Sequence, residues 1–187
     1  TAMRHNAELL MSDEFMNFWF DEQGAIYGGL FQYMPIGRGI TLEDMVTSEQ
    51  RRWMLERLIE VLYDDGRFLI DFWNGGPLSE GCIAAGRQGG YFHLDWNGDI
   101  SPCVFMPYAA ANIQDLYAEG KDLSSVLESG FFKEIRAWQE DYYGKKDGTP
   151  PRNLFMPCPM RDHHDVAHEC VVKHGARPTD PGAADAL

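Results

Sequence analysis

Two cysteines flank a stretch of sequence that is typical of a tight β-hairpin. Cys82 precedes, and Cys103 lies within, two runs of alternating apolar and polar residues joined by Asn97-Gly98. Asn-Gly is the preferred central pair of a two-residue type I′ turn, because both positions need positive φ. Such a turn would place Cys103 opposite Phe92, near the end of the hairpin at which Cys82 enters. The pattern predicts that two thiols 21 positions apart share one site.

Two further cysteines follow much later in the chain. Cys158 lies between two prolines, and Cys170 lies on the apolar face of a helix predicted to begin after the N-cap Asp162. Cys170 fits either a fourth ligand or a small buried hydrophobic residue. His163 and His164, together with Asp162, lie close to Cys158 in the sequence and are alternative ligands.

The spacing of the cysteines bears on the kind of metal site. Zinc sites commonly use close C-x₂-C pairs, and none occurs in this sequence. Single cysteines from separate elements fit an iron–sulfur cluster better. Two disulfides, a zinc site and a metal-free domain remain alternatives.

The composition excludes several classes of partner. The chain has 187 residues, 44% of them hydrophobic, with 16 basic and 29 acidic residues and a net charge of -13. An acidic chain is a poor match for a nucleic-acid backbone or an anionic membrane. There is no long apolar run and no basic N-terminus followed by an apolar core. We expect a cytoplasmic chain with no membrane span. Because it starts at Thr1 without an initiator methionine, we expect a piece of a longer protein.

The first part of the chain has the pattern of an α/β unit. Ser12 is an N-cap for a helix over about 12–22, and Thr47 with Gln50 forms a capping box for a helix that ends near Gly66. The expected apolar stripes are Phe15, Phe18 and Trp19 in the first helix, and Leu55, Leu58, Ile59 and Leu62 in the second. Strands are predicted over 25–34 and 67–73. Strand, helix and strand in that order favour parallel pairing.

A change of composition at 74–77, Asn-Gly-Gly-Pro, predicts a domain boundary. The hairpin follows it. Next come a pair of helices marked by Leu123, Val126 and Leu127 and by Phe131, Ile135 and Trp138, and then a last helix. The predicted fold class is an α/β first domain followed by a small α+β domain with a β-hairpin.

The cysteine spacing resembles the auxiliary-cluster domain of radical S-adenosylmethionine (SAM) enzymes, called SPASM or, in its shortened form, twitch. In that family a cysteine, a spacer, a glycine and four residues precede a second cysteine. Here 15 residues separate Cys82 from Gly98, and four separate Gly98 from Cys103. A full SPASM domain carries more clustered cysteines than Cys158 and Cys170. The resemblance therefore implies a single auxiliary [4Fe–4S] cluster, held by Cys82, Cys103, Cys158 and Cys170.

Upstream segments are similar to the last strands of the partial (β/α) barrel of these enzymes. They are 33–38, 47–51 and 71–74. The resemblance implies that 1–75 is the C-terminal part of the barrel and that 76–187 is the auxiliary-cluster domain. The family's C-x₃-C-x₂-C loop, which binds the SAM-cleaving cluster, does not occur. We therefore expect this chain alone not to cleave SAM, and the missing half or a partner to carry that cluster.

The resemblance also suggests residues near SAM, which lies at the carboxyl ends of the barrel strands. Met34 would pass near the adenine, Asn6 could face the ribose, and Arg38 could bind a carboxylate. Asn6 can equally be an ordinary residue preceding a helix, and Arg38 an ordinary loop residue. The implied function is radical-based modification of a peptide, lipid or cofactor precursor. The alternatives are a stand-alone iron–sulfur electron-transfer or binding module and a zinc-stabilised or metal-free structural domain.

Overall fold

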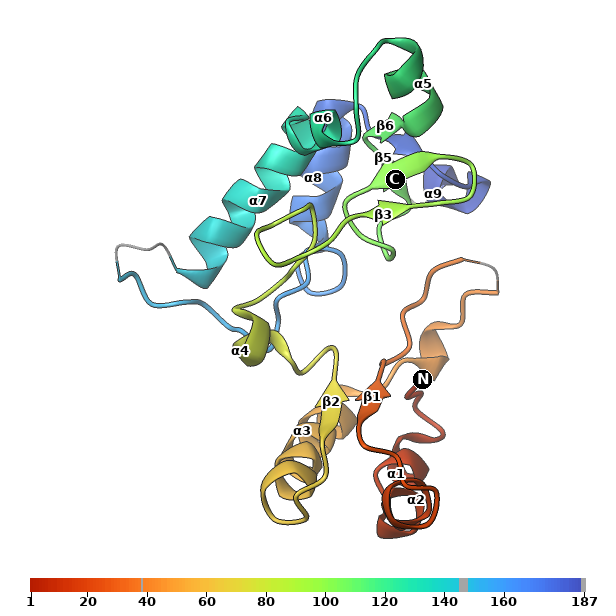
Figure 1. Ribbon diagram of the computed structural model, residues 1–187, viewed down its shortest axis with the longest axis vertical. Coiled ribbons are helices and arrows are strands. Elements are labelled where there is room, and N and C mark those ends of the chain that lie inside the picture. Colours follow the sequence, from red (N-terminus) through yellow and green to blue (C-terminus); the bar gives the residue numbers. More distant parts are fainter. Residues whose placement is uncertain (38, 145–147, 186–187) are drawn as a thin grey trace. The chain divides into compact units, whose positions relative to one another are not determined.

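The chain forms two compact units, which are described separately. The computed structural model describes residues 1–37, 39–144 and 148–185. Unit 1 is Thr1–Gly76 and unit 2 is Pro77–Leu187, a division one residue from the expected boundary. Over the described ranges the chain mixes helices with small two- and three-stranded sheets, none of which closes into a barrel (Figure 1). None of the helices in these ranges is long and apolar enough to cross a membrane.

Unit 1 is built around two short parallel strands and one long helix. Its elements are α1 (Ala7–Leu10), α2 (Asp13–Met16), the π-helix η1 (Asn17–Glu22), β1 (Gly28–Leu30), the 3₁₀-helix η2 (Leu42–Asp44), α3 (Ser48–Tyr63) and β2 (Leu69–Asp71). β1 and β2 pair in parallel, with Gly28 opposite Leu69. Ala2 forms a further parallel bridge to Gln32. The parallel pairing predicted from the strand–helix–strand pattern is therefore present.

The first predicted helix begins as expected but ends differently. The Ser12 side chain accepts a hydrogen bond from the Phe15 amide at 3.2 Å. From Asn17 the helix widens into the π-helix η1, which changes the direction of the side chains that follow. Phe18 and Trp19 are consequently 42% and 46% exposed, so the predicted apolar stripe is wrong there.

The capping box of α3 forms as predicted. Thr47 and Gln50 exchange side-chain to backbone hydrogen bonds of 3.1 and 3.0 Å. The buried face consists of Met54, Leu58 and Val61. Ile59, which was expected on this face, is 48% exposed. The stripe is offset because α3 packs on β2 and on a methionine-rich core that also contains Met11 and Met16.

Unit 2 combines two small antiparallel sheets with a packed helix pair. Its elements are α4 (Gly76–Ser79), β3 (His93–Leu94), β4 (Asp99–Ser101), β5 (Tyr108–Ala109), β6 (Ala111–Asn112), α5 (Ile113–Ala118), α6 (Ser124–Leu127), α7 (Gly130–Tyr143), α8 (His164–His174), β7 (Arg177–Pro178) and α9 (Pro181–Asp185). The sheets have the orders β3-β4-β6 and β5-β7. Helices α7 and α8 lie side by side, to the left of the sheets in Figure 1.

The core of unit 2 lies between α7, α8 and β4. Ser129 caps α7 by accepting a hydrogen bond from the Phe132 amide at 3.3 Å. Phe132, Ile135 and Ile100 are almost fully buried in this core. The core fixes one face of α7, and this helix in turn positions the loops that carry the cysteines.

Candidate metal centre

The hairpin forms at the predicted place but with a different turn. The amide of Gly98 donates to the carbonyl of Asp95 at 3.1 Å, and the turn therefore spans four residues. Gly98 has φ of +87°, whereas Asn97 does not adopt positive φ, so the predicted type I′ turn is wrong. The reason is Asp95, whose carboxylate accepts hydrogen bonds from the amides of Asn97 (2.8 Å) and Asp99 (2.9 Å). A turn that ends in one left-handed glycine is a common longer hairpin connection.

This turn shifts the register of the hairpin by one residue. His93 pairs with Ser101 and Leu94 with Ile100. The ladder ends there, because the Tyr91 amide donates to the carbonyl of Ile83 and the Pro102 carbonyl accepts from Ala85. The hydroxyl oxygen of Tyr91 lies 3.1 Å from Cys103 Sγ. The expectation that Phe92 would face Cys103 is wrong, and Phe92 instead packs in the core.

Three of the four cysteines influence one another electrostatically. Cys82 lies in the loop after α4, Cys103 follows β4, and Cys158 lies in the turn between α7 and α8. Burial raises the pKa of Cys82 and of Cys103 to about 11 and that of Cys158 to about 12. Like-charge repulsion between these sulfurs also raises their pKa values. Cys103 raises the pKa of Cys82, Cys158 raises that of Cys103, and Cys82 raises that of Cys158.

Each of these three sulfurs accepts a hydrogen bond from a backbone amide two or three residues later in the chain. The donors are Ala84 to Cys82, Phe105 to Cys103 at 3.4 Å and Arg161 to Cys158 at 3.4 Å. These contacts lower the pKa of the thiols, in opposition to burial. Because burial outweighs these contacts, the pKa of each thiol is raised overall and the amide donors only moderate the increase.

Two residues of α7 hold the Cys82 loop. Gly81 has φ of +98°, and a Cβ atom at this position would lie 2.1 Å from the ring of Tyr143. The hydroxyl of Tyr143 donates to the carbonyl of Pro157, next to Cys158. Gln139 is only 1% exposed; its Nε2 donates to the carbonyl of Ala84 at 3.2 Å, and its side chain hydrogen-bonds to Cys82. Helix α7 therefore positions both Cys82 and Cys158.

Cys170 has a different environment. It is 3% exposed on α8 and belongs to the core of unit 2. Burial raises its pKa to about 11, and the charged groups that act on it are Glu134, Lys173 and Glu169. Its thiol also hydrogen-bonds to the Glu134 carboxylate. The interactions that link Cys82, Cys103 and Cys158 do not include Cys170.

The alternative ligands near Cys158 are engaged in other contacts. The Asp162 carboxylate accepts from the Cys158 amide at 3.1 Å and forms a two-point ion pair with Arg161. His163 Nε2 lies 2.9 Å from the carbonyl of Met156, and His164 is exposed at the start of α8. Asp162 was expected to cap the last helix, but the N-cap of α8 is His163. Asp162 stabilises the Cys158 turn instead.

Within the described ranges, no three His, Cys, Asp or Glu side chains are arranged to hold one metal ion. In an iron–sulfur cluster the cysteines bind separate irons, and amide hydrogen bonds to their sulfurs are a usual feature. Three neighbouring sulfurs, each with an amide donor, match that requirement.

The residues proposed to lie near SAM are in unit 1. Asn6 Oδ1 accepts from the Met3 amide at 2.7 Å, and its Nδ2 donates to the carbonyl of Thr1 at 3.2 Å, so its side chain fixes the local turn. Met34 is buried. Arg38 lies outside the described residues.

Unit 1 also contains a buried polar group after its two parallel strands. Asp71 accepts hydrogen bonds from Gln32 Nε2 (2.8 Å), Asn74 Nδ2 (2.8 Å) and the Trp73 amide (3.0 Å). Burial raises the pKa of Asp71. Gln32 Oε1 is buried and has no hydrogen-bond partner among the described residues. In the sequence, 71–74 was noted only through the family resemblance. A carboxylate at the end of an apolar strand, however, itself indicates a buried polar group.

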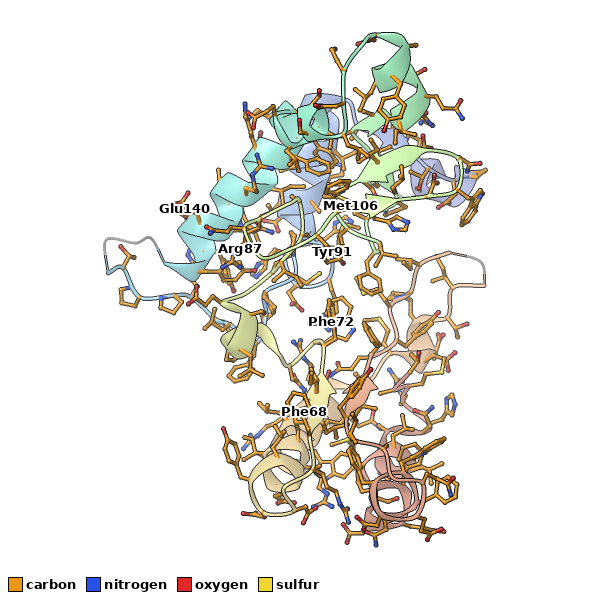
Figure 2. The ribbon with its side chains drawn as sticks, in the orientation of Figure 1. Phe68, Phe72, Arg87, Tyr91, Met106 and Glu140 are labelled. Atoms are coloured by element: carbon orange, nitrogen blue, oxygen red, sulfur yellow. The ribbon has the colours of Figure 1, made fainter. Side chains whose placement is uncertain are left out.

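A cavity of ≈ 710 Å³ borders the cysteine site within unit 2. Arg87 and Glu140, labelled in Figure 2, belong to the loop and the helix on either side of it. Gln139 and Tyr143 line the cavity and also contact the Cys82 loop. Its remaining lining residues are Glu80, Gln88, Arg136, Gly144, Thr149, Pro151 and Leu154. Arg87 lines the cavity as well, and its Nη1 donates to the carbonyl of Cys82 at 3.1 Å.

Three residues of the site were missed by sequence reasoning: Tyr91, Gln139 and Tyr143. Gln139 could have been identified from the sequence, because it is a polar amide on the otherwise apolar face of α7 defined by Phe131 and Ile135. Tyr91 could not be found because it depends on the hairpin register. Comparison of the chain with family models, with curated proteins and with solved structures found no match.

Proposed function

We propose that unit 2 binds an auxiliary [4Fe–4S] cluster through Cys82, Cys103 and Cys158, and that the chain is part of a radical SAM enzyme. The observation that carries this proposal is the electrostatic interaction among three thiols from three separate segments, each with a backbone amide donor to its sulfur. The cluster would supply one-electron chemistry or a binding point beside the substrate. The chain's own residues would hold it in a buried position.

The site supports a cluster rather than a disulfide pair or a zinc knuckle. The sequence has no close C-x₂-C pair, which zinc sites commonly use. Three sulfurs interact in this site, whereas each disulfide joins only two, so a disulfide would leave one of these thiols unpaired. Since Cys170 donates to Glu134, three thiolates of this chain would bind three irons and leave the fourth to a different ligand.

Unit 1 supports the second part of the proposal through an uncovered sheet face. Leu30 and Leu69 point into the core, whereas Phe31, Phe68 and Ile70 are 48%, 57% and 38% exposed. Phe68 and Phe72 flank β2 in Figure 2. Parallel sheets are normally covered on both faces. We propose that further barrel strands, on a missing half or a partner that carries the SAM cluster, cover this face, and that the full enzyme modifies a peptide, lipid or cofactor precursor.

The test is anaerobic reconstitution of the chain with iron and sulfide, followed by iron and sulfide analysis. Cys82→Ala, Cys103→Ala and Cys158→Ala should each lose most of the bound iron. Cys170→Ala is the matched control, because it removes a buried thiol of the same unit outside the proposed site, and it should load like the wild type. Equal loading by all four variants would exclude the proposed ligands, and binding of zinc without sulfide would favour the structural-domain alternative.

A further inference from the structure

Tyr91 contacts the sulfur of Cys103 with its hydroxyl group. The Tyr91 oxygen lies 3.1 Å from Cys103 Sγ, a short distance for a contact to sulfur. Either atom of this contact could be the donor. Tyr91 lies two residues before β3 and Cys103 two residues after β4, just beyond the last hairpin pair, His93 and Ser101.

The protonation of the two groups determines which of them donates the hydrogen bond. A phenol of ordinary pKa, about 10, keeps its proton at neutral pH. A metal-bound thiolate has no proton of its own, so the phenol O–H would be the donor to Cys103 Sγ. Tyr91 also interacts electrostatically with Cys82, so it lies near two of the three sulfurs.

We propose that Tyr91 is a positioning residue that donates a hydrogen bond to the Cys103 thiolate and thereby raises the reduction potential of the bound cluster. This inference rests on the proposed function. Reduction adds one electron and therefore negative charge, part of which resides on the ligating sulfurs. A hydrogen bond to such a sulfur stabilises the reduced state more than the oxidised state, and such bonds are one of the determinants of cluster potential. The Tyr91 proton stays on the phenol oxygen in both states.

The experiment is a redox titration of the reconstituted chain with dithionite, which supplies one electron to each cluster, followed by electron paramagnetic resonance. Tyr91→Phe should lower the ratio of reduced to oxidised cluster about tenfold at a fixed potential, a shift of about 59 mV to more negative values. Tyr108→Phe is the matched control. Tyr108 is a buried tyrosine of the same unit whose hydroxyl donates to the Ala183 carbonyl, so its loss should leave the potential unchanged.

A second variant gives a shift in the opposite direction. Replacement of Tyr91 by 3-fluorotyrosine keeps the ring and makes the hydroxyl a stronger donor, so the potential should become more positive. An unchanged potential in Tyr91→Phe with normal iron content overturns the inference and leaves the proposed function intact. If Tyr91→Phe does not fold, an unchanged potential with 3-fluorotyrosine overturns it equally. Failure of the wild-type chain to bind iron and sulfide overturns the proposed function itself.

Discussion

Gly81→Ala should disturb the cysteine site through a steric clash that can be calculated from the structure. The added Cβ would lie 2.1 Å from the Tyr143 ring, a distance at which either the ring or the loop must move. A residue with a side chain at φ of +98° carries a conformational cost of about 1–2 kcal/mol. Overpacking against a buried ring adds about 1–3 kcal/mol. We expect the free energy of unfolding, measured by urea titration with circular dichroism, to fall by about 2–5 kcal/mol.

Gly89→Ala measures the backbone cost of a side chain at positive φ without the steric clash. Gly89 has φ of +76°, and no described heavy atom lies within 4 Å of its added Cβ. This control therefore carries the backbone cost alone, and Gly81→Ala should be the less stable variant by about 1–3 kcal/mol. Gly81→Ala should also bind less iron on reconstitution, because Cys82 is the next residue. Equal loss of stability in both variants would refute the contact between Gly81 and Tyr143.

Two further predictions concern pH and catalysis. Burial raises the pKa of Asp71, so the native state binds this proton more tightly than the unfolded state. The contribution of Asp71 to stability should be greatest below its unfolded pKa of about 3.9 and should be lost as pH rises through the native value. Asp71→Asn should flatten this slope in urea titrations across that range, and an unchanged slope would contradict the assignment. With dithionite and SAM, the reconstituted chain should form no 5′-deoxyadenosine, because it lacks a C-x₃-C-x₂-C triad. Detection of this product would contradict the proposed division of roles.

Local signals in the sequence predicted the local structure well. The Ser12 cap and the Thr47–Gln50 capping box depend on residues three apart, and both formed. The parallel pairing of β1 and β2 followed from the order of strand, helix and strand. The buried faces were predicted less well, since the burial of Ile59 or Trp19 depends on packing partners elsewhere in the chain.

The candidate site was only partly predictable. The hairpin could be located from Asn97-Gly98, but its register depended on the hydrogen bonds of Asp95, which the turn rule does not include. The contact of Tyr91 with Cys103 lies beyond the last pair of the hairpin, where the loop at 83–86 forms the hydrogen bonds. The approach of Cys158 to the hairpin depends on α7, which is held by core packing over long sequence separations. The environment of Cys170 depends on the same packing.

Mössbauer spectroscopy, together with iron and sulfide analysis of the anaerobically reconstituted chain, decides whether unit 2 binds a [4Fe–4S] cluster. We expect about four irons and about four sulfides per chain, in a cluster that depends on Cys82, Cys103 and Cys158. A single iron or zinc without sulfide, or a chain that remains free of metal, would contradict it.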